Sequence, residues 1–173
     1  MAERVLMTRT LMVGVYPLKR EIVEVTSPQV KKLFSDIKGG TFGTKSRCVG
    51  VEPLSGASIK INDFSVALAA TFGLTAGEKT TVTIMSSYQN DNGVQSVEQE
   101  IWYGEIMDMT DEGSKSTGSD SALQSMSINF ANLDSAEKYL DGKTIHNINL
   151  VTDEIDFGSG DILQAHRVAV GRP

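Results

Sequence analysis

The chain has 173 residues, of which 40% are apolar, and it carries a net charge of −6. This length suits a single domain, and this share of apolar residues is enough for a core, which excludes a wholly disordered chain. The acidic balance, without a block of lysines and arginines, disfavours a sequence-reading DNA-binding protein, because such proteins neutralise phosphates with a basic surface. The only cysteine, Cys48, excludes an intramolecular disulfide.

The apolar stretches of the chain are short. Val66–Ala70 is among the longest, far below the ~20 residues that a membrane helix needs. No run of signal-peptide character follows Met1. We therefore expect a protein that is made and kept, or assembled, in a cytoplasm, and that has no membrane partner.

In chain order, the first expected strand spans Val13–Val25, in two pieces around Pro17. The glycine-rich stretch Lys38–Ser46 reads as a loop, and Cys48 follows it in an expected strand as a small, half-buried residue. A short helix comes next. We expect this helix to be capped by Asn62 or Asp63 and to end at Gly73. Its apolar stripe, at i, i+4 and i+8, consists of Phe64, Leu68 and Phe72.

Period-2 alternation then dominates, which predicts a mainly β protein. The alternating stretches are Thr80–Tyr88, Ser96–Met109 and Leu123–Leu133, and Gly104 is expected to mark a bulge or bend in the second. Asp141-Gly142 separates two β-competent runs and predicts a tight hairpin. A second short helical piece is expected around Asp161 to Val168, which completes a chain with few helical residues.

The segment Asp111–Asp120 contains only small and polar residues and lies between two long strands. We expect it to be a long, mobile inter-strand loop in the isolated subunit.

Several stretches look like catalytic or binding motifs but fail on spacing. In Gly39–Ser46 an extra threonine separates the glycine from Lys45, so the lysine is out of register for a phosphate-binding loop. The carboxylates of Asp153–Asp161 do not match a calcium-binding loop and read as a solvated turn. His146 and His166 lack the partners for zinc or for a nucleophile pair. We therefore expect no enzymatic activity, no cofactor and no metal.

Five stretches occur in an order that resembles the major tail tube proteins of contractile-tailed bacteriophages and the related tubes of R-type bacteriocins. The stretches are Ile22–Gly40, Ser86–Gln89 before Asn92-Gly93, Trp102–Met109, Tyr139–Lys143 and Gly160–Arg167. Together they cover nearly the whole chain. After His166-Arg167 the family usually has a second basic or polar residue, where this chain has Val168-Ala169.

The resemblance implies a single tail tube domain over residues 1–173, with an N-terminal arm over residues 1–12. Its implied fold is a β-barrel or sandwich of two packed antiparallel sheets with one short α-helix. Such subunits form hexameric rings that stack into a hollow tube inside the sheath of a virion tail, and the tube is assembled in the bacterial host cytoplasm. Implied partners are the sheath protein, baseplate and terminator proteins, and DNA that passes non-specifically through the lumen during ejection. The acidic balance agrees with a lumen to which DNA does not adhere.

We expect the arm and the Asp111–Asp120 loop to become ordered only on assembly, because both lack apolar anchors. The candidate inter-ring and inter-subunit contact residues are polar or charged side chains in or beside the expected loops and near the C-terminus. They are Asp111, Glu112, Lys115, Lys38, Lys45 and Arg167.

Two alternatives stay open. The chain could form the tube of an R-type bacteriocin or a type VI secretion-like apparatus, which need not conduct DNA. It could instead be a small β-barrel enzyme or ligand-binding module with Trp102 and His146 in a cavity. If the chain is a tube subunit of either kind, we expect Trp102 to be a core or subunit-interface aromatic.

Overall fold

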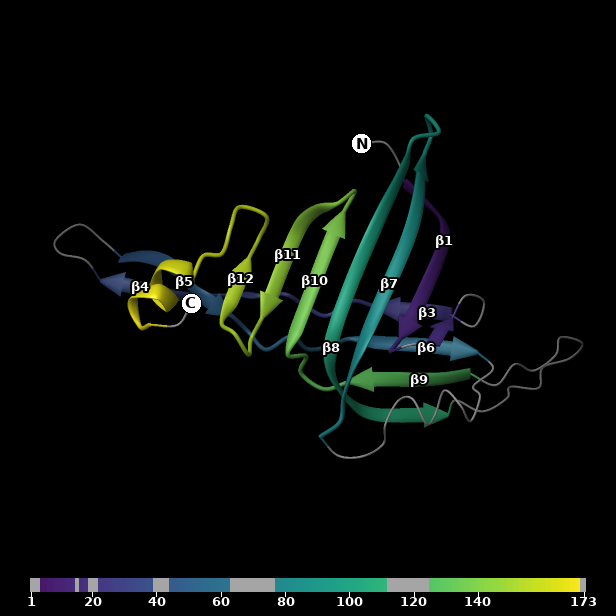
Figure 1. Ribbon diagram of the computed structural model, residues 1–173, viewed down its shortest axis with the longest axis horizontal. Coiled ribbons are helices and arrows are strands. Elements are labelled where there is room, and N and C mark those ends of the chain that lie inside the picture. The colour runs from purple at the N-terminus through teal and green to yellow at the C-terminus, as the bar shows by residue number, and fades with distance from the viewer. Residues whose placement is uncertain are drawn as a thin grey trace, which may run out of the picture.

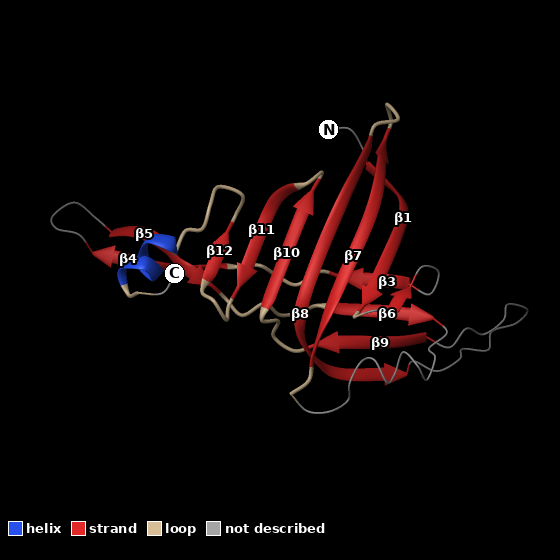
Figure 2. Cartoon of the chain, viewed as in Figure 1, coloured by secondary structure: helices blue, strands red, loops and turns tan. Residues whose placement is uncertain are grey.

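The structure is a computed structural model, and it describes residues 4–14, 16–18, 22–38, 44–62, 77–111 and 125–171. Almost all of its regular structure is β-strand (Figure 2). The strands are, in chain order, β1 (Arg4–Val13), β2 (Tyr16–Leu18), β3 (Ile22–Thr26), β4 (Lys32–Lys38), β5 (Thr44–Val51), β6 (Ser58–Asn62), β7 (Lys79–Asn90), β8 (Gln95–Asp111), β9 (Ser125–Phe130), β10 (Ser135–Leu140), β11 (Lys143–Asn149) and β12 (Glu154–Asp156).

Two antiparallel sheets form a sandwich and share one strand. Sheet A has the order β12-β11-β10-β8-β7-β1-β2, and sheet B has the order β3-β6-β9-β8. The longer part of β8, from Gln95 to Glu105, pairs with β7 and, over Glu98 to Tyr103, with β10 in sheet A. Its last residues, from Ile106 to Asp111, pair with β9 in sheet B. The strands of the two sheets cross steeply (Figure 1). The prediction of two packed antiparallel sheets is confirmed in its sandwich form, and the described strands do not close into a barrel.

The passage of β8 from one sheet to the other occurs where the sequence predicts a bend. Gly104 is buried, and a Cβ at this position would lie 2.6 Å from Leu133 Cδ2 and 3.1 Å from Leu133 Cα. The register then shifts between Ile106 and Asp108, so Met107 has no partner on β9. The glycine allows Leu133 to approach, and the bulge turns the strand into sheet B.

Side chains of both sheets meet in one apolar core. Along β7 and β9 the buried positions alternate with exposed or half-buried ones, as period-2 alternation predicts. Trp102 is 1% exposed and packs edge-on against the ring of Phe130, with 6.1 Å between the ring centroids. The fully buried residues include Leu11, Val13, Leu54, Ile59, Ile61, Val82, Ile128, Leu133 and Ile148. Trp102 is therefore a core aromatic.

One predicted turn and one predicted helix can be compared with the structure directly. Asp141 and Gly142 both have positive φ, 50° and 75°, and they join β10 to β11 as the predicted tight hairpin. The C-terminal helical piece is confirmed as α2 (Gln164–Ala169). The expected helix after Asp63 lies outside the described residues. No helix in the described ranges is long and apolar enough to cross a membrane.

The N-terminal part of the chain differs from its expected form as an unanchored arm. Residues 4–13 form β1, which pairs with β7 from Arg4↔Asn90 to Val13↔Val82. Leu11 and Val13 are completely buried, so these side chains supply the anchor. Further along, Val13–Val25 is divided among strands, but not at Pro17 as predicted, because Pro17 lies inside β2, the edge strand of sheet A, where it pairs with Met12. The next strand, β3, belongs to sheet B.

Candidate functional site

The side of sheet B that faces away from the core is polar across all four strands. Cross-strand pairing places Thr26, Ser58, Asn129 and Asp108 in one row of this face. We call this surface the sheet B outer face; its residues are Glu24, Thr26, Ser58, Lys60, Asn62, Ser125, Ser127, Asn129, Asp108 and Thr110. Its charged side chains are two carboxylates and one ammonium group, and it contains no large apolar side chain.

Hydrogen bonds fix part of this face. The amide of Asn129 donates to Asp108 Oδ1 at 2.7 Å, and Thr110 Oγ1 donates to the same oxygen at 3.5 Å. Asp108 is therefore held in a local polar network on a strand whose opposite face packs on the core.

Both edges of sheet B are open within the part of the chain that the structure describes. β3 pairs only with β6, and the last residues of β8, from Ile106 to Asp111, pair only with β9. Because all neighbouring strands of the sheet are antiparallel and there are four, the two edge strands run in opposite directions. An open edge presents backbone N–H and C=O groups that can pair with another strand.

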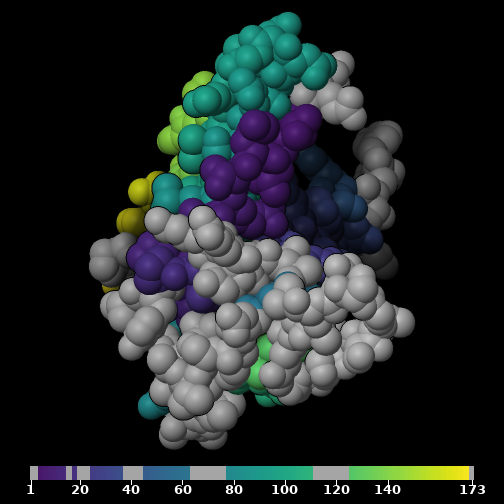
Figure 3. Space-filling model, turned by 90° about the vertical axis from the view of Figure 1, so that its right-hand side faces the viewer, coloured from purple at the N-terminus to yellow at the C-terminus, as the bar shows by residue number. Residues whose placement is uncertain are grey.

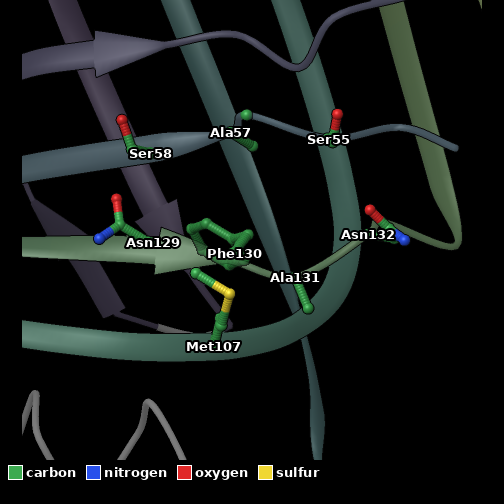
Figure 4. Close-up of a pocket in the computed structure, with 9 residues that line it drawn as sticks. Ser55, Ala57, Ser58, Met107, Asn129, Phe130, Ala131 and Asn132 are labelled. Carbon is green, nitrogen blue, oxygen red and sulfur yellow. The ribbon is translucent and has the colours of Figure 1, made fainter.

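A shallow hollow lies at the corner where β8 enters sheet B (Figure 4). Its volume is about 460 Å³, and Met107 reaches into it with 65% of its surface exposed. The lining residues are small, apolar or amide-bearing, namely Ser55, Gly56, Ala57, Ser58, Met107, Asn129, Phe130, Ala131 and Asn132. None of them is ionisable, so this hollow has no group for acid–base chemistry.

A buried carboxylate lies on the core face of sheet A. Glu100 is 6% exposed and accepts hydrogen bonds from Ser27 Oγ at 2.8 and 3.0 Å and from Trp102 Nε1 at 3.1 Å. The ammonium group of Lys138 is 2.8 Å from its other oxygen and 3.3 Å from Glu98. Every donor comes from this chain, so the carboxylate is satisfied internally and ties the segment after β3 to sheet A.

The titration of the groups around Glu100 follows from this packing. Burial disfavours the charged form of Lys138, but the hydrogen bond and charge of Glu100 outweigh it and raise the Lys138 pKa above its usual value. Burial lowers the pKa of His146, and the charge of Glu100 opposes that shift only in part. His146 lies across from Lys138 in the β10–β11 pair. His146 is therefore a neutral, half-buried imidazole beside the ion pair of Lys138 and Glu100, and this arrangement is structural. Trp102 is fully buried and does not form a ligand cavity with His146.

The β4–β5 hairpin forms a sheet of its own, separate from the sandwich. In Figure 1 it extends away from the sandwich beyond β12, next to α2. Its large apolar side chains are exposed, with Leu33 at 47%, Phe34 at 59% and Val49 at 44%. Near its base, Lys32 Nζ lies 4.3 Å from the centroid of the Phe157 ring. The strand expected around Cys48 is confirmed as β5.

The hairpin also corrects the expected loop over Lys38–Ser46. Lys38 is the last residue of β4, and Thr44, Lys45 and Ser46 begin β5. Pairing of the two strands, down to Lys38↔Thr44, extends regular structure into the glycine-flanked stretch. The remaining residues of the expected loop, 39–43, lie outside the described residues.

The structure scatters the candidate contact residues. Lys38 and Lys45 lie on the β4–β5 hairpin, and Asp111 is the last residue of β8. Glu112 and Lys115 lie outside the described residues.

Arg167 is engaged within its own chain. Its guanidinium group pairs with Asp161 at 2.5 Å and donates to the backbone carbonyl of Asp153 at 3.1 Å, and its side chain is 15% exposed. Asp161 Oδ1 in turn accepts from the backbone N–H groups of Ile155 and Leu163 at 3.0 Å each. Arg167 thus fastens α2 to the turn before β12.

Sequence reasoning missed the exposed hairpin and did not identify which strands lie at the open edges. Alternation identifies strands and their two faces, but an edge exists only once the strand order is known. The exposed Leu33, Phe34 and Val49 look like ordinary core residues in the sequence.

Comparisons with known proteins agree with this architecture. A search of solved structures found a chain of an extracellular contractile injection system, the PVC sheath/tube terminator in the extended state, with a TM-score of 0.51 and 14% sequence identity over 77% of this chain and 92% of that chain. A second match, in the baseplate of the anti-feeding prophage, has a TM-score of 0.41 and 9% identity over 76% of this chain and 89% of that chain, which is too distant to support an argument. A search of curated proteins found no match.

The family comparison covers nearly the whole chain. The model of the phage tail tube protein FII family matches residues 4–171. This match includes both sheets, the β4–β5 hairpin and α2. The chain therefore belongs to the phage tail tube protein FII family, and it is a structural tail component and not an enzyme.

Proposed function

We propose that copies of this chain close into hexameric rings, and that the rings stack into a hollow tube that lies inside a contractile sheath and conducts DNA during ejection. The observation that carries the ring is the pair of open edges of sheet B, which run in opposite directions. Rotation about a ring axis brings β3 of one copy beside the end of β8 of the next copy, and the two strands are then antiparallel. An even number of strands per copy thus lets one antiparallel sheet continue around the ring.

Such a contact is heterologous, since a different edge is used on each side of the subunit, and it closes when the rotation completes a circle. Backbone pairing would also cover two edges that are otherwise prone to aggregation. The apolar face of sheet B points toward sheet A, so the polar outer face is the one left to line a lumen.

The sheet B outer face suits the passage of a polyanion. Its charged residues are Glu24, Lys60 and Asp108, and the rest of the face consists of hydroxyl and amide side chains. DNA adheres to surfaces whose lysines and arginines release counterions from phosphates. A slightly acidic face therefore lets DNA pass without binding. We expect an Asp108→Lys, Thr26→Lys double variant to form tubes that retain labelled DNA in a filter assay at low salt, where the parent tubes do not.

The ring is tested by cross-linking its predicted edges. In a Cys48→Ser background, Glu24→Cys and Thr110→Cys place one thiol on the outer face of each edge strand. A flexible bis-maleimide should convert the double variant into a ladder of covalent species that ends at the number of subunits in one ring, six. Each single variant should give no ladder, because a neighbour then offers no second thiol. A double variant that stays monomeric, while negative-stain microscopy shows rings, would mean that other surfaces close the ring.

The loop Asp111–Asp120 remains part of the proposal as a contact between rings. The proposal rests on its small, polar composition, since residues 112–120 lie outside the described part of the chain. Deletion of Gly113–Gly118 should leave a folded subunit that no longer stacks, and tubes of normal length from this variant would contradict the role.

A tube that does not conduct a genome is the second candidate. This candidate is supported by the fold similarity to a chain of an extracellular contractile injection system. The sheath and the terminator named for that structure are the kinds of partner we propose here, together with baseplate proteins. Nuclease-protected DNA inside ejecting particles would separate the two functions.

A further inference from the structure

The two edges of sheet B are joined to sheet A in different ways. At one edge the last residues of β8, from Ile106 to Asp111, continue a strand that already belongs to sheet A, so the backbone itself fixes their position. Among the described strands β3 forms the other edge, three strands away. In Figure 1 it lies on the side of sheet B nearest the tip of β7 and β8. Any tilt of sheet B about β8 therefore displaces β3 the most.

Apolar packing holds β3 less firmly than it holds the inner strands of sheet B. Among the described side chains of β3, Val25 is half-buried and packs against the core, whereas Glu24 and Thr26 are exposed. The inner strands β6 and β9 bury Ile59 and Ile128 almost completely. Backbone pairing with β6 fixes β3 within its own sheet but not against sheet A. A strand with few buried apolar contacts opens locally at a low cost in free energy.

A side-chain contact joins the end of β3 to sheet A. Ser27 follows the last residue of β3, and its hydroxyl donates to the carboxylate of Glu100, with distances of 2.8 and 3.0 Å to the two oxygens. We call this the Ser27–Glu100 contact. The N–H group of Gln29 also bonds, to the carbonyl of Ser55, but that bond leads to the stretch before β6 and does not reach sheet A.

The burial of Glu100 is a poor source of stability. Its carboxylate is 6% exposed and has lost most of its hydration, a cost that the ion pair with Lys138 and the bond from Trp102 offset. Replacement of a buried ion pair by apolar side chains of similar volume is often neutral or stabilising. A satisfied buried polar network specifies one packing arrangement instead, because its hydrogen bonds are complete only there. The carboxylate thus favours one position of β3 on sheet A.

The Ser27–Glu100 contact lies toward the margin of the sandwich. Sheet A projects past sheet B, and Figure 3 shows the tip of β7 and β8, in teal, beyond β1, in purple. Glu100 lies on β8 between this tip and the core residue Trp102. In the next row toward the tip, on the same face, β7 and β8 carry the polar pair Ser86 and Glu98. The contact therefore fixes β3 where the apolar packing of β7 and β8 gives way to polar side chains.

We propose that Glu100 is a positioning residue for assembly, whose carboxylate holds the end of β3 through Ser27 and presents this strand at the angle that closes a ring. The inference rests on the proposed ring, in which β3 meets the end of β8 of the next copy. Every contact in a ring repeats the same geometry, so a displacement of β3 accumulates around the circle. The Ser27–Glu100 contact thus matters little for the stability of the isolated subunit and much for ring closure.

The Ser27→Ala variant tests this contact without disturbing the core. Glu100→Ala is unsuitable, because it leaves Trp102 Nε1 buried without its acceptor. Ser27 itself is exposed, and after its hydroxyl is removed the carboxylate keeps Trp102 and Lys138 as partners. The isolated variant should therefore unfold at the same denaturant concentration as the parent.

Two further measurements should change in Ser27→Ala. In the isolated subunit, the amides of β3 that bond to β6 should exchange hydrogen about tenfold faster than in the parent, because the strand opens more often. In the cysteine variant of the ring test, Ser27→Ala should move the onset of the cross-linked ladder to an about tenfold higher protein concentration. Ser27→Thr keeps the hydroxyl and should behave like the parent in both measurements.

A matched control is Ser86→Ala. Ser86 is 2% exposed, and its hydroxyl accepts from Arg9 Nε at 3.0 Å. This variant also loses one hydroxyl bond to a charged side chain, but the bond lies within sheet A. The exchange of β3 and the onset of the ladder should both stay as in the parent.

The outcomes separate the Ser27–Glu100 contact from the ring. Unchanged exchange of β3 in Ser27→Ala, or equal acceleration in Ser86→Ala, overturns the proposal. Faster exchange with an unchanged ladder overturns the role of Glu100 in assembly and leaves the ring standing, as does a Ser27→Thr variant that assembles as poorly as Ser27→Ala. If the parent cysteine variant forms neither a ladder nor rings, the proposed ring fails, and the positioning role fails with it.

Discussion

The sandwich and the β4–β5 hairpin are built from the same antiparallel strands, yet they stand in opposite relation to solvent. The sandwich buries Trp102, Ile128 and the other core side chains between two sheets, whereas the hairpin leaves Phe34 and Leu33 exposed. Burial of such side chains stabilises a fold by ~1.5–3 kcal/mol each. The sandwich is therefore stabilised by its own packing, whereas the hairpin leaves apolar side chains exposed within the part of the chain that the structure describes.

The largest expected difference between the two regions comes from removing one aromatic side chain in each. Trp102→Ala should lower the free energy of unfolding by ~3–5 kcal/mol, because it opens a cavity beside Phe130 and removes a donor to Glu100. Phe34→Ala should change it by less than about 0.5 kcal/mol, because the ring is mostly exposed. Chemical denaturation measures both. Equal losses would show that the hairpin packs on the sandwich after all.

A pair of glycines gives a smaller test of the same contrast. Gly104→Ala should cost ~2 kcal/mol, because the new Cβ meets Leu133 at 2.6 Å and its backbone at 3.1 Å. Gly50→Ala on β5 should be nearly neutral, because nothing lies within 4 Å of the added atom. Thermal unfolding of both variants checks the difference, and recovery in a Gly104→Ala, Leu133→Ala variant would identify Leu133 as the obstacle.

Two of the basic candidates for assembly contacts, Arg167 and Lys45, should separate in the same way. Arg167→Ala should cost ~1 kcal/mol of stability through the loss of its ion pair with Asp161 and its bond to the Asp153 carbonyl. Lys45→Ala should leave the unfolding free energy unchanged, because the side chain is exposed on the hairpin. If Lys45 contacts a neighbouring subunit, as the sequence analysis expects, Lys45→Glu should nevertheless reduce tube length by microscopy. If the Arg167→Ala subunit is as stable as the parent, Arg167 is not needed for the fold, and a role in contacts between subunits is favoured instead.

The smallest expected effect is a pH dependence confined to the sandwich. His146 has a pKa below 6.5 in the folded chain because of burial, so the unfolded chain binds the proton more readily. Its contribution is present above about pH 6.5 and is lost as the pH falls through the folded pKa. His146→Gln should flatten this part of the stability profile in denaturation experiments between pH 7 and pH 5. A profile identical to that of the parent would assign the acid sensitivity to other groups.

The contrast also explains which parts of the fold could be predicted from the sequence. The Asp141-Gly142 turn and the bend at Gly104 depend on local backbone geometry, and local geometry is encoded in neighbouring residues. The two faces of β8 could be recognised from alternation, but the buried face could not be chosen. That face carries Glu100, which is tolerated in the core because Ser27 and Lys138, distant in sequence, neutralise and bond it.

The candidate site was harder to predict because it consists of places where pairing stops. The edges at β3 and at the end of β8 follow from strand order, which no local pattern encodes. Lys45 lies on an exposed element as predicted, whereas Arg167 turned out to be held by Asp161, a residue six positions before it. Its charge indicated a surface position, but the sequence does not reveal the ion pair.

The shared strand β8 has a mechanical consequence. Because Gln95–Asp111 belongs to both sheets, the two layers are joined by peptide bonds as well as by side-chain packing. A load applied at the sheet B end of β8 is carried into the middle of sheet A along the backbone, so the layers cannot slide past each other without stretching a covalent chain. A tube of such subunits would transmit thrust as a rigid rod, with the resistance to shear built into every subunit.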